Sequence, residues 1–153
     1  MPLSLDPEYH KAVEPLLTAF ENAPKLPIGD IQGRRTALDN LIGGLVAQIP
    51  EATNVKEEVY HVKSQDGFEM SLYHYVRQDG DTSRSALEPA VYYLHGGGYI
   101  CMDVAMYRSR LKNLVAETGV QFFAAEYRPS PEVRYPKALE DAWAGLIHAD
   151  IPC

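Results

Sequence analysis

The chain has 153 residues, of which 46% are hydrophobic and 23% charged, which suits about one domain with a substantial core. Its formal net charge of -7 argues against a general nucleic-acid binder, because a phosphate backbone requires a basic surface. No stretch approaches the roughly 18 apolar residues of a membrane span, and the first residues lack the order of a secretory signal. We therefore expect a cytoplasmic protein in which Cys101 and Cys153 are free thiols.

The first third of the chain predicts two helices. Asp6 followed by Pro7 is a typical helix start, since an aspartate caps the free N–H groups and proline tolerates the first position. Apolar residues then recur at helical spacing, although Pro15 is expected to kink or interrupt the helix. A second apolar stripe over 38–49 predicts another helix, which Pro50 ends.

Two runs of alternating character follow, and they meet at Asp66-Gly67. This pattern predicts an antiparallel hairpin from Val55 to Val76 with a turn at the Asp-Gly pair. A polar loop over 77–89 separates the hairpin from the remainder of the chain.

From Ala90 the chain alternates between strands and helices. The apolar runs 90–96 and 120–127 lack alternation, which is typical of strands buried on both faces. A helix lies between them, with Gly119 just past its end. Pro136 opens the last helix, whose apolar stripe comprises Ala138, Leu139, Ala142, Trp143, Leu146 and Ile147. Strand, helix, strand, helix predicts a parallel sheet with crossover helices.

The stretch YYLHGGGYI, residues 92–100, places three glycines directly after a predicted strand. Dinucleotide binding needs Gly-x-Gly-x-x-Gly leading into a helix, which contiguous glycines do not supply. A purely structural interpretation is a tight turn near crowded backbone. A third is an oxyanion hole, in which backbone N–H groups stabilise a carbonyl oxygen that becomes negative during acyl transfer. HGGGY after a strand matches the oxyanion motif of α/β-hydrolase lipases and esterases, so the third interpretation is favoured.

A later segment extends this match. After the glycines come Tyr127-Arg128, Pro131-Glu132, Tyr135-Pro136 and the acidic pair Glu140-Asp141. Together with the glycine motif, these residues resemble the hormone-sensitive-lipase-like branch of α/β-hydrolases, strongly over 55–150. The resemblance implies an α/β fold: a helical cap region over 1–50, then a partial core domain over 51–153. That core would be the N-terminal half of an α/β-hydrolase sheet, with an antiparallel hairpin before parallel strands.

The resemblance also implies roles for the glycine motif. Gly97 and Gly98 would donate their N–H groups to the oxyanion, and Gly96 would let the loop turn. His95 would position this loop, because the catalytic base of that family lies near its far C-terminus. Tyr99 either lines the acyl pocket or simply packs, and both possibilities stay open.

Charged residues of the later segment have structural interpretations. Glu140 and Asp141 suit stabilisation of a helix dipole better than the role of catalytic acid. Arg128 and Glu132 are expected to form an ion pair or a backbone clamp that fixes the turn after the strand.

A nucleophile is missing from the sequence. A serine esterase needs Gly-x-Ser-x-Gly, and none of the serines has that setting: Ser4, Ser64, Ser71, Ser83, Ser85, Ser109 and Ser130. In the resembling family the nucleophile, acid and base all come later in the chain, so we expect no catalytic residue here. The expected function is a carboxylic ester hydrolase by family in a truncated or inactive form, without cofactor or metal.

Two alternatives stay open, a non-catalytic small-molecule-binding or regulatory relative and one half of a two-chain hydrolase. A small acyl ester would be the substrate only if the missing residues were supplied. In that family the strand ending in the oxyanion motif pairs with the nucleophile strand, so 90–94 would keep an open apolar edge. A partner chain or a second copy could associate there.

Overall fold

The structure is a computed structural model that describes residues 4–78 and 89–149. Most of the predicted polar loop, with Ser83 and Ser85, and the expected thiol of Cys153 lie outside the described residues. The chain divides into two compact units, Met1–Asp30 and Ile31–Cys153. The sequence-based division at residue 50 stays a prediction.

The first unit contains helix α1, Pro7–Asn22. Its start is as predicted, because Asp6 Oδ1 accepts hydrogen bonds from the backbone N–H groups of Glu8 and Tyr9, at 2.9 and 3.2 Å. The predicted interruption at Pro15 is absent, and the helix runs through it. Proline removes one helical hydrogen bond at that point, and the turns on either side continue the helix.

The second unit begins with helix α2, Ile31–Val46, which starts ahead of the predicted stripe. None of its residues is fully buried, and it packs against α3, Val104–Thr118. Across the part of the chain that the structure describes, no helix is both long and apolar enough to cross a membrane.

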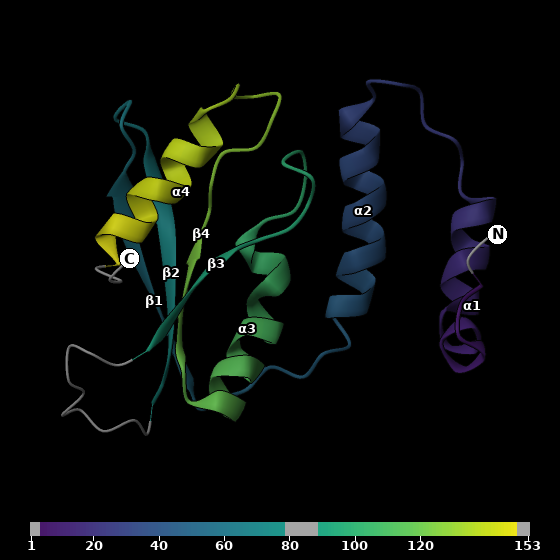
Figure 1. The fold of residues 1–153 in the computed structure, drawn as a ribbon, viewed down its shortest axis with the longest axis horizontal. Coiled ribbons are helices and arrows are strands. Elements are labelled where there is room, and N and C mark those ends of the chain that lie inside the picture. The colour runs from purple at the N-terminus through teal and green to yellow at the C-terminus, as the bar shows by residue number, and fades with distance from the viewer. Residues whose placement is uncertain (1–3, 79–88, 150–153) are drawn as a thin grey trace. The chain divides into compact units, whose positions relative to one another are not determined.

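A four-stranded mixed sheet forms the centre of this unit (Figure 1). Its strands are β1 (Val55–Lys63), β2 (Glu69–Arg77), β3 (Ala90–Leu94) and β4 (Gln121–Ala125), in the spatial order β1-β2-β4-β3. The β1–β2 and β2–β4 pairs are antiparallel, whereas β3 and β4 are parallel. The predicted hairpin followed by a strand–helix–strand crossover is therefore confirmed.

Two helices cover opposite faces of the sheet, α3 on one and α4, Lys137–His148, on the other. Alternation along the strands divides the core, because Tyr75 of β2 packs with α3 residues while Leu72 lies in the cluster that α4 covers. α3 ends as predicted at Gly119, which has a φ of 72° and takes the left-handed cap conformation.

Strand β3 differs from its prediction as a strand buried on both faces. None of its residues is fully buried, and Val91 and Leu94 are exposed. The reason is its position, since within the described residues it pairs only with β4 and its other edge is uncovered. Such an edge presents unpaired backbone donors and acceptors beside apolar side chains.

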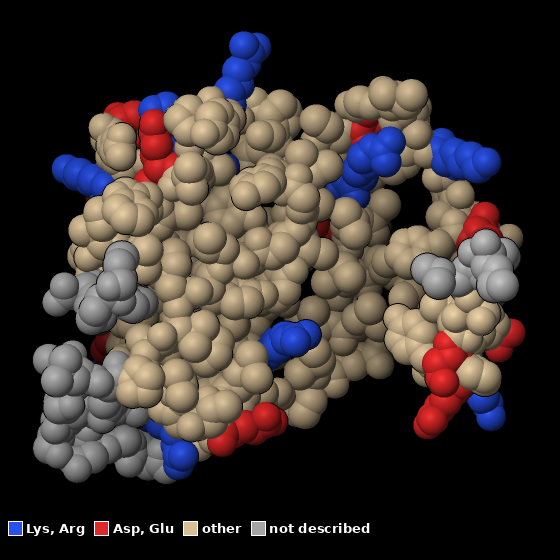
Figure 2. Space-filling model, viewed as in Figure 1, with Lys and Arg blue, Asp and Glu red and all other residues tan. Residues whose placement is uncertain are grey.

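Helix α4 also differs, because its small residues face the sheet. Ala142 and Gly145 are buried, whereas the larger apolar side chains of the predicted stripe, Leu139, Trp143 and Ile147, are exposed. Tyr92 Oη donates to the carbonyl of Ala142 at 2.6 Å, which brings the helix close to the sheet. On the face drawn in Figure 2, charged side chains lie mainly near the margins of the core unit.

We predict that Gly145→Ala destabilises the chain although alanine favours helices. A Cβ at this position would overlap Tyr92 Oη and lie 2.7 Å from Met70 Cε. Overpacking of this kind costs about 1–3 kcal/mol. Gly43→Ala in α2 is the matched control, because nothing lies within 4 Å of its Cβ position. The control should gain up to about 1 kcal/mol. Urea midpoints that rise for both variants would contradict the prediction.

Candidate functional site

The glycine loop joins β3 to α3 through three successive residues with positive φ. Gly97, Gly98 and Tyr99 have φ values of 125°, 61° and 62°. The N–H groups of Ile100 and Cys101 donate to the carbonyl oxygen of Gly97 at 3.1 and 3.2 Å, which closes a tight turn. A Cβ at Gly97 would overlap the carbonyl oxygen of Cys101, so the turn requires glycine there.

The orientation of one peptide follows from this turn. The Gly97 carbonyl accepts the two backbone bonds and a third from Cys101 Sγ at 3.0 Å. Because the C=O and N–H of a trans peptide point in opposite directions, the N–H of Gly98 points away from Cys101. Among the residues that the structure describes, the N–H groups of Gly97 and Gly98 have no acceptor. Both donors are thus available to a ligand.

His95 is buried at the junction of β3 and the loop, with 4% of its surface exposed. Its Nδ1 lies 2.9 Å from the carbonyl oxygen of Gly96, and its ring stacks on Tyr127 at 4.2 Å and 7°. Tyr127 Oη donates to the carbonyl oxygen of His95 at 2.7 Å, and burial raises the pKa of Tyr127 to about 12. These contacts join the loop to the end of β4. The anchoring role of His95 stays a prediction with this geometry as its basis.

Glu126 lies behind His95 and fixes the far end of the loop. Its Oε2 accepts the backbone N–H of Val104 at 2.9 Å, and its Oε1 lies 3.7 Å from His95 Nε2. Asp103 caps the same helix by accepting the N–H of Met106 at 2.9 Å. Burial raises the pKa of Glu126 above its ordinary value. The start of α3 is therefore held by two carboxyl groups.

Arg128 and Asp141 form the ion pair that joins the exit of β4 to α4. The Nε and Nη2 atoms of Arg128 donate to the two carboxylate oxygens at 2.8 and 2.7 Å, and its backbone N–H donates at 3.1 Å. Asp141 has no exposed surface. The predicted pairing of Arg128 with Glu132 is therefore wrong. Asp141, which the sequence assigned to the helix dipole, is the counter-ion of Arg128. Arg128 and Asp141 are 13 residues apart in the sequence, and they meet because α4 folds back against the exit of β4.

The same guanidinium reaches the tip of the hairpin. Arg128 Nη2 donates to Asp66 Oδ1 at 3.1 Å, and the ring centroid of Phe68 lies 4.0 Å from Arg128 Cζ. The hydrogen bonds that Arg128 donates to Asp141 and then to Asp66 raise the pKa of Arg128 above its ordinary value. One side chain thus connects the hairpin, the exit of β4 and α4.

A hollow of about 300 Å³ opens beside the glycine loop. The loop contributes Gly96, Gly98 and Tyr99 to its lining, and α4 contributes Ala138, Leu139 and Ala142. Leu94, His95 and Tyr127 complete it. The structure thus brings together every predicted site residue of the loop except Gly97, which does not line the hollow. Tyr99 lines it, and its ring centroid lies 6.1 Å from that of Tyr127.

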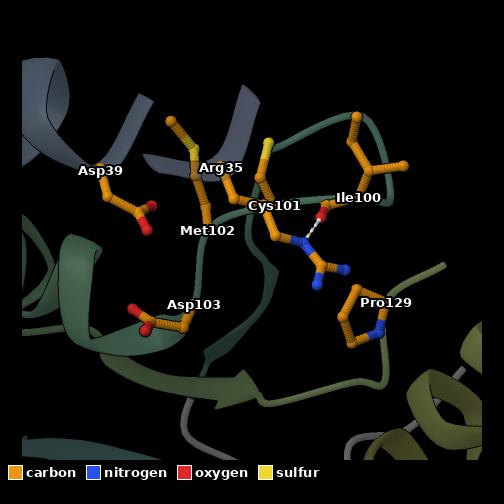
Figure 3. Close-up of a pocket in the computed structure, with 7 residues that line it drawn as sticks. All are labelled: Arg35, Asp39, Ile100, Cys101, Met102, Asp103 and Pro129. Carbon is orange, nitrogen blue, oxygen red and sulfur yellow. Dashed lines mark hydrogen bonds between the residues drawn. The ribbon is translucent and has the colours of Figure 1, made fainter. Parts of the chain in front are cut away.

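On the other side of the loop lies a smaller pocket of about 170 Å³ that the sequence did not indicate (Figure 3). It contains Arg35 of α2, together with Ile100 and Cys101 of the loop. Burial raises the pKa of the Cys101 thiol, which already donates to Gly97, so it is a poor nucleophile. Arg35 belongs to no recognised sequence motif, and the contacts that distinguish it are long-range.

The described residues that line the hollow include no serine or cysteine. Ser130, for instance, lies in the turn after β4, where its Oγ donates to the carbonyl oxygen of Val133 at 3.2 Å. In the same described part of the chain, no group of three or more His, Cys, Asp or Glu side chains could hold a metal ion. Within the described residues, the hollow therefore combines largely apolar walls with the glycine loop and is lined by no serine or cysteine.

Comparison with known proteins finds similarity to one family over part of the chain. Residues 91–150 match a family described as alpha/beta hydrolase fold. Hormone-sensitive lipase of Mus musculus is 36% identical over 66 residues, which is 40% of this chain and 9% of that protein. Ethyl acetate hydrolase of Pseudomonas putida is 38% identical over 61 residues, which is 38% of this chain and 19% of that protein. The chain therefore matches only a small part of these relatives.

Solved structures show the same fold over nearly the whole chain. A bacterial heroin esterase has a TM-score of 0.73 and 24% identity, covering 94% of this chain and 42% of that chain. Vibralactone cyclase has a TM-score of 0.76 and 25% identity, covering 95% of this chain and 42% of that chain. The predicted resemblance to hormone-sensitive-lipase-like α/β-hydrolases is confirmed, and this partial coverage fits the N-terminal half that the sequence indicated.

We predict that Gly97→Ala destabilises the chain more than Gly98→Ala. Both positions have positive φ, where a non-glycine residue costs about 1–3 kcal/mol. Only Gly97 lies against the Cys101 carbonyl, whereas nothing lies within 4 Å of the Cβ position of Gly98. The difference between the two urea midpoints measures this overlap. Equal urea midpoints would show that the turn can open to accept the Cβ at Gly97 without loss of stability.

A third prediction concerns the pH dependence of the Arg128–Asp141 pair. Burial acts to raise the pKa of Asp141, but the bonds from Arg128 outweigh it, so the pKa lies below its ordinary value. Such a carboxyl contributes stability above its ordinary pKa and loses it as the pH falls through the lowered pKa. Asp141→Asn should cost about 3 kcal/mol near pH 7, because it leaves a charged partner without its counter-ion.

The urea midpoints of the wild type and Asp141→Asn should therefore converge below about pH 4, as the wild-type carboxyl takes up a proton. Glu140→Gln is the control on the same helix. A gap between wild type and Asp141→Asn that stays constant from neutral to acidic pH would contradict the assignment.

Proposed function

From the α/β-hydrolase match over residues 91–150, we propose that this chain supplies the oxyanion-hole part of a serine carboxylic-ester hydrolase. The observation that carries the proposal is the pair of N–H donors without acceptors in the described residues, at Gly97 and Gly98, beside a largely apolar hollow. The printed names of the similar proteins, a lipase and several esterases, support the same class of reaction.

Ester cleavage uses these groups in a defined way. Attack on the ester carbon moves negative charge onto the carbonyl oxygen, and the N–H groups of Gly97 and Gly98 donate to that oxygen. One such donor raises kcat by a factor of about 10²–10³, because it is already oriented before the reaction. Leu94, Leu139 and Ala142 provide apolar walls for a small acyl chain.

The nucleophile must come from outside the 153 residues, because none of their serines lies in Gly-x-Ser-x-Gly. The open edge of β3 is where we place its source. A strand added there in parallel would end at the same edge of the sheet as Leu94, beside the glycine loop. Such a strand, whether from later in the same polypeptide or from a partner chain, would complete the site, and the 153 residues by themselves would be inactive.

A second candidate is a non-catalytic small-molecule binder. It is favoured by the hollow itself, which offers donors and apolar walls although no serine or cysteine of the described residues lines it. A ligand with a carbonyl or carboxylate group and a short apolar chain would suit those walls.

We predict that the purified chain does not hydrolyse p-nitrophenyl butyrate above the rate of a Gly97→Ala control of equal concentration. Adding a polypeptide that carries the Gly-x-Ser-x-Gly strand of a related esterase should produce turnover. Turnover by the chain alone that the glycine variant lacks would refute the need for a second polypeptide.

Binding distinguishes the two candidates. Butyrate places a negative oxygen next to a short apolar chain, so it should shift the amide signals of Gly97 and Gly98 in a ¹⁵N–¹H spectrum. Butylammonium has the same chain with a positive charge and is the control. If butyrate shifts the two amides and no complementing strand produces turnover, the chain is a binder. If butyrate leaves them unchanged, the loop is not an anion site.

A further inference from the structure

Arg35 of α2 makes four hydrogen bonds to two segments far along the chain. Its Nε donates to the carbonyl oxygen of Ile100 at 2.5 Å, as Figure 3 shows, and its Nη2 donates to that of Ser130 at 2.9 Å. Its Nη1 and Nη2 hold the two carboxylate oxygens of Glu132 at 2.6 and 2.7 Å. One side chain thus joins α2, the glycine loop and the turn after β4.

The two carbonyls that Arg35 holds belong to the residues that shape the glycine loop. Ile100 donates its N–H to Gly97, and Ser130 donates its N–H to the carbonyl oxygen of Tyr99 at 2.7 Å. The Tyr99 carbonyl and the Ile100 N–H form one peptide, so fixing the first orients the second toward Gly97. The Gly97 carbonyl then sets the direction of the Gly98 N–H. Arg35 is therefore connected to that N–H through alternating hydrogen bonds and peptide units.

Resting on the function proposed above, we propose that Arg35 is the positioning residue of the oxyanion loop. It does not line the hollow, and it acts by holding Ile100 and Ser130 in the arrangement that turns the Gly98 N–H away from Cys101. The role also accounts for Glu132 of the Pro131-Glu132 motif, which orients the guanidinium.

The chemistry of the contact requires arginine. A planar guanidinium donates along several fixed directions, which lets it serve a carboxylate and two carbonyls at once, whereas a lysine ammonium is a compact charge on a flexible stem. The hydrogen bond from Arg35 lowers the pKa of Glu132 to about 2, so Glu132 stays ionised over the working range of an esterase. Because α2 has no fully buried residue, its attachment to the loop depends strongly on the polar contacts of Arg35.

The test compares Arg35→Lys and Arg35→Met by amide hydrogen exchange in the full chain. Lysine keeps the positive charge but lacks the planar set of guanidinium donors, and methionine lacks both. The amides of Cys101 and Ser130 should exchange about tenfold faster in both variants, because hydrogen bonds from a charged donor are worth about that much. The amides of β4 should be unchanged. Arg110→Met, which removes an exposed arginine of α3, is the control and should alter neither set.

Two outcomes would overturn the proposal. Wild-type exchange in Arg35→Lys would show that charge alone suffices, and equal acceleration of loop and β4 amides would show a general loss of stability. We also expect both Arg35 variants to shift the ¹⁵N–¹H signal of Gly98. If Arg35→Met does not fold, Arg35→Lys decides the question. These measurements need no substrate, so a failed turnover assay would count against the proposed function and leave this result standing.

Discussion

The buried ion pair between Arg128 and Asp141 is the interaction on which the remainder of the core depends. It lies where β4 ends, and it attaches α4 to the sheet at the point where that helix begins to wall the hollow. Without a counter-ion, a fully buried carboxylate would be strongly unfavourable, so each partner requires the other. The hairpin joins the same network through Asp66. The glycine loop is held separately, by the end of β4 and the turn after it together with Arg35 of α2.

Local sequence patterns predicted most elements because each depends on nearby residues. The cap at Asp6, the Asp66-Gly67 turn and the end of α3 at Gly119 are all specified within a few positions. Burial was predicted less well, because it depends on which elements come together. An apolar run such as 90–94 has the composition of a central strand, and only the strand order shows that β3 lies at an edge of the described sheet. Likewise, α4 turned its small residues inward because Tyr92 leaves no space for larger ones.

The candidate site divides in the same way. Its motif residues are contiguous in sequence, so the loop and its positive φ angles could be anticipated from glycines after a strand. Its supporting ion pairs could not. Arg128 and Glu132 are four residues apart between β4 and α4, which suggested a pair, yet each pairs with a residue of a helix, Asp141 of α4 in one case and Arg35 of α2 in the other. Separations of 13 and 97 residues carry no local signal.

The close contact at Gly145 has a meaning for selectivity. This residue touches no part of the hollow, yet it sets how near α4 lies to the sheet, and α4 carries Ala138, Leu139 and Ala142 along one wall. The width of the hollow therefore depends on Gly145, which lacks a side chain and lies outside the hollow on the same helix. Relatives that differ at this position would be expected to differ in the size of ligand they accept, even with identical lining residues.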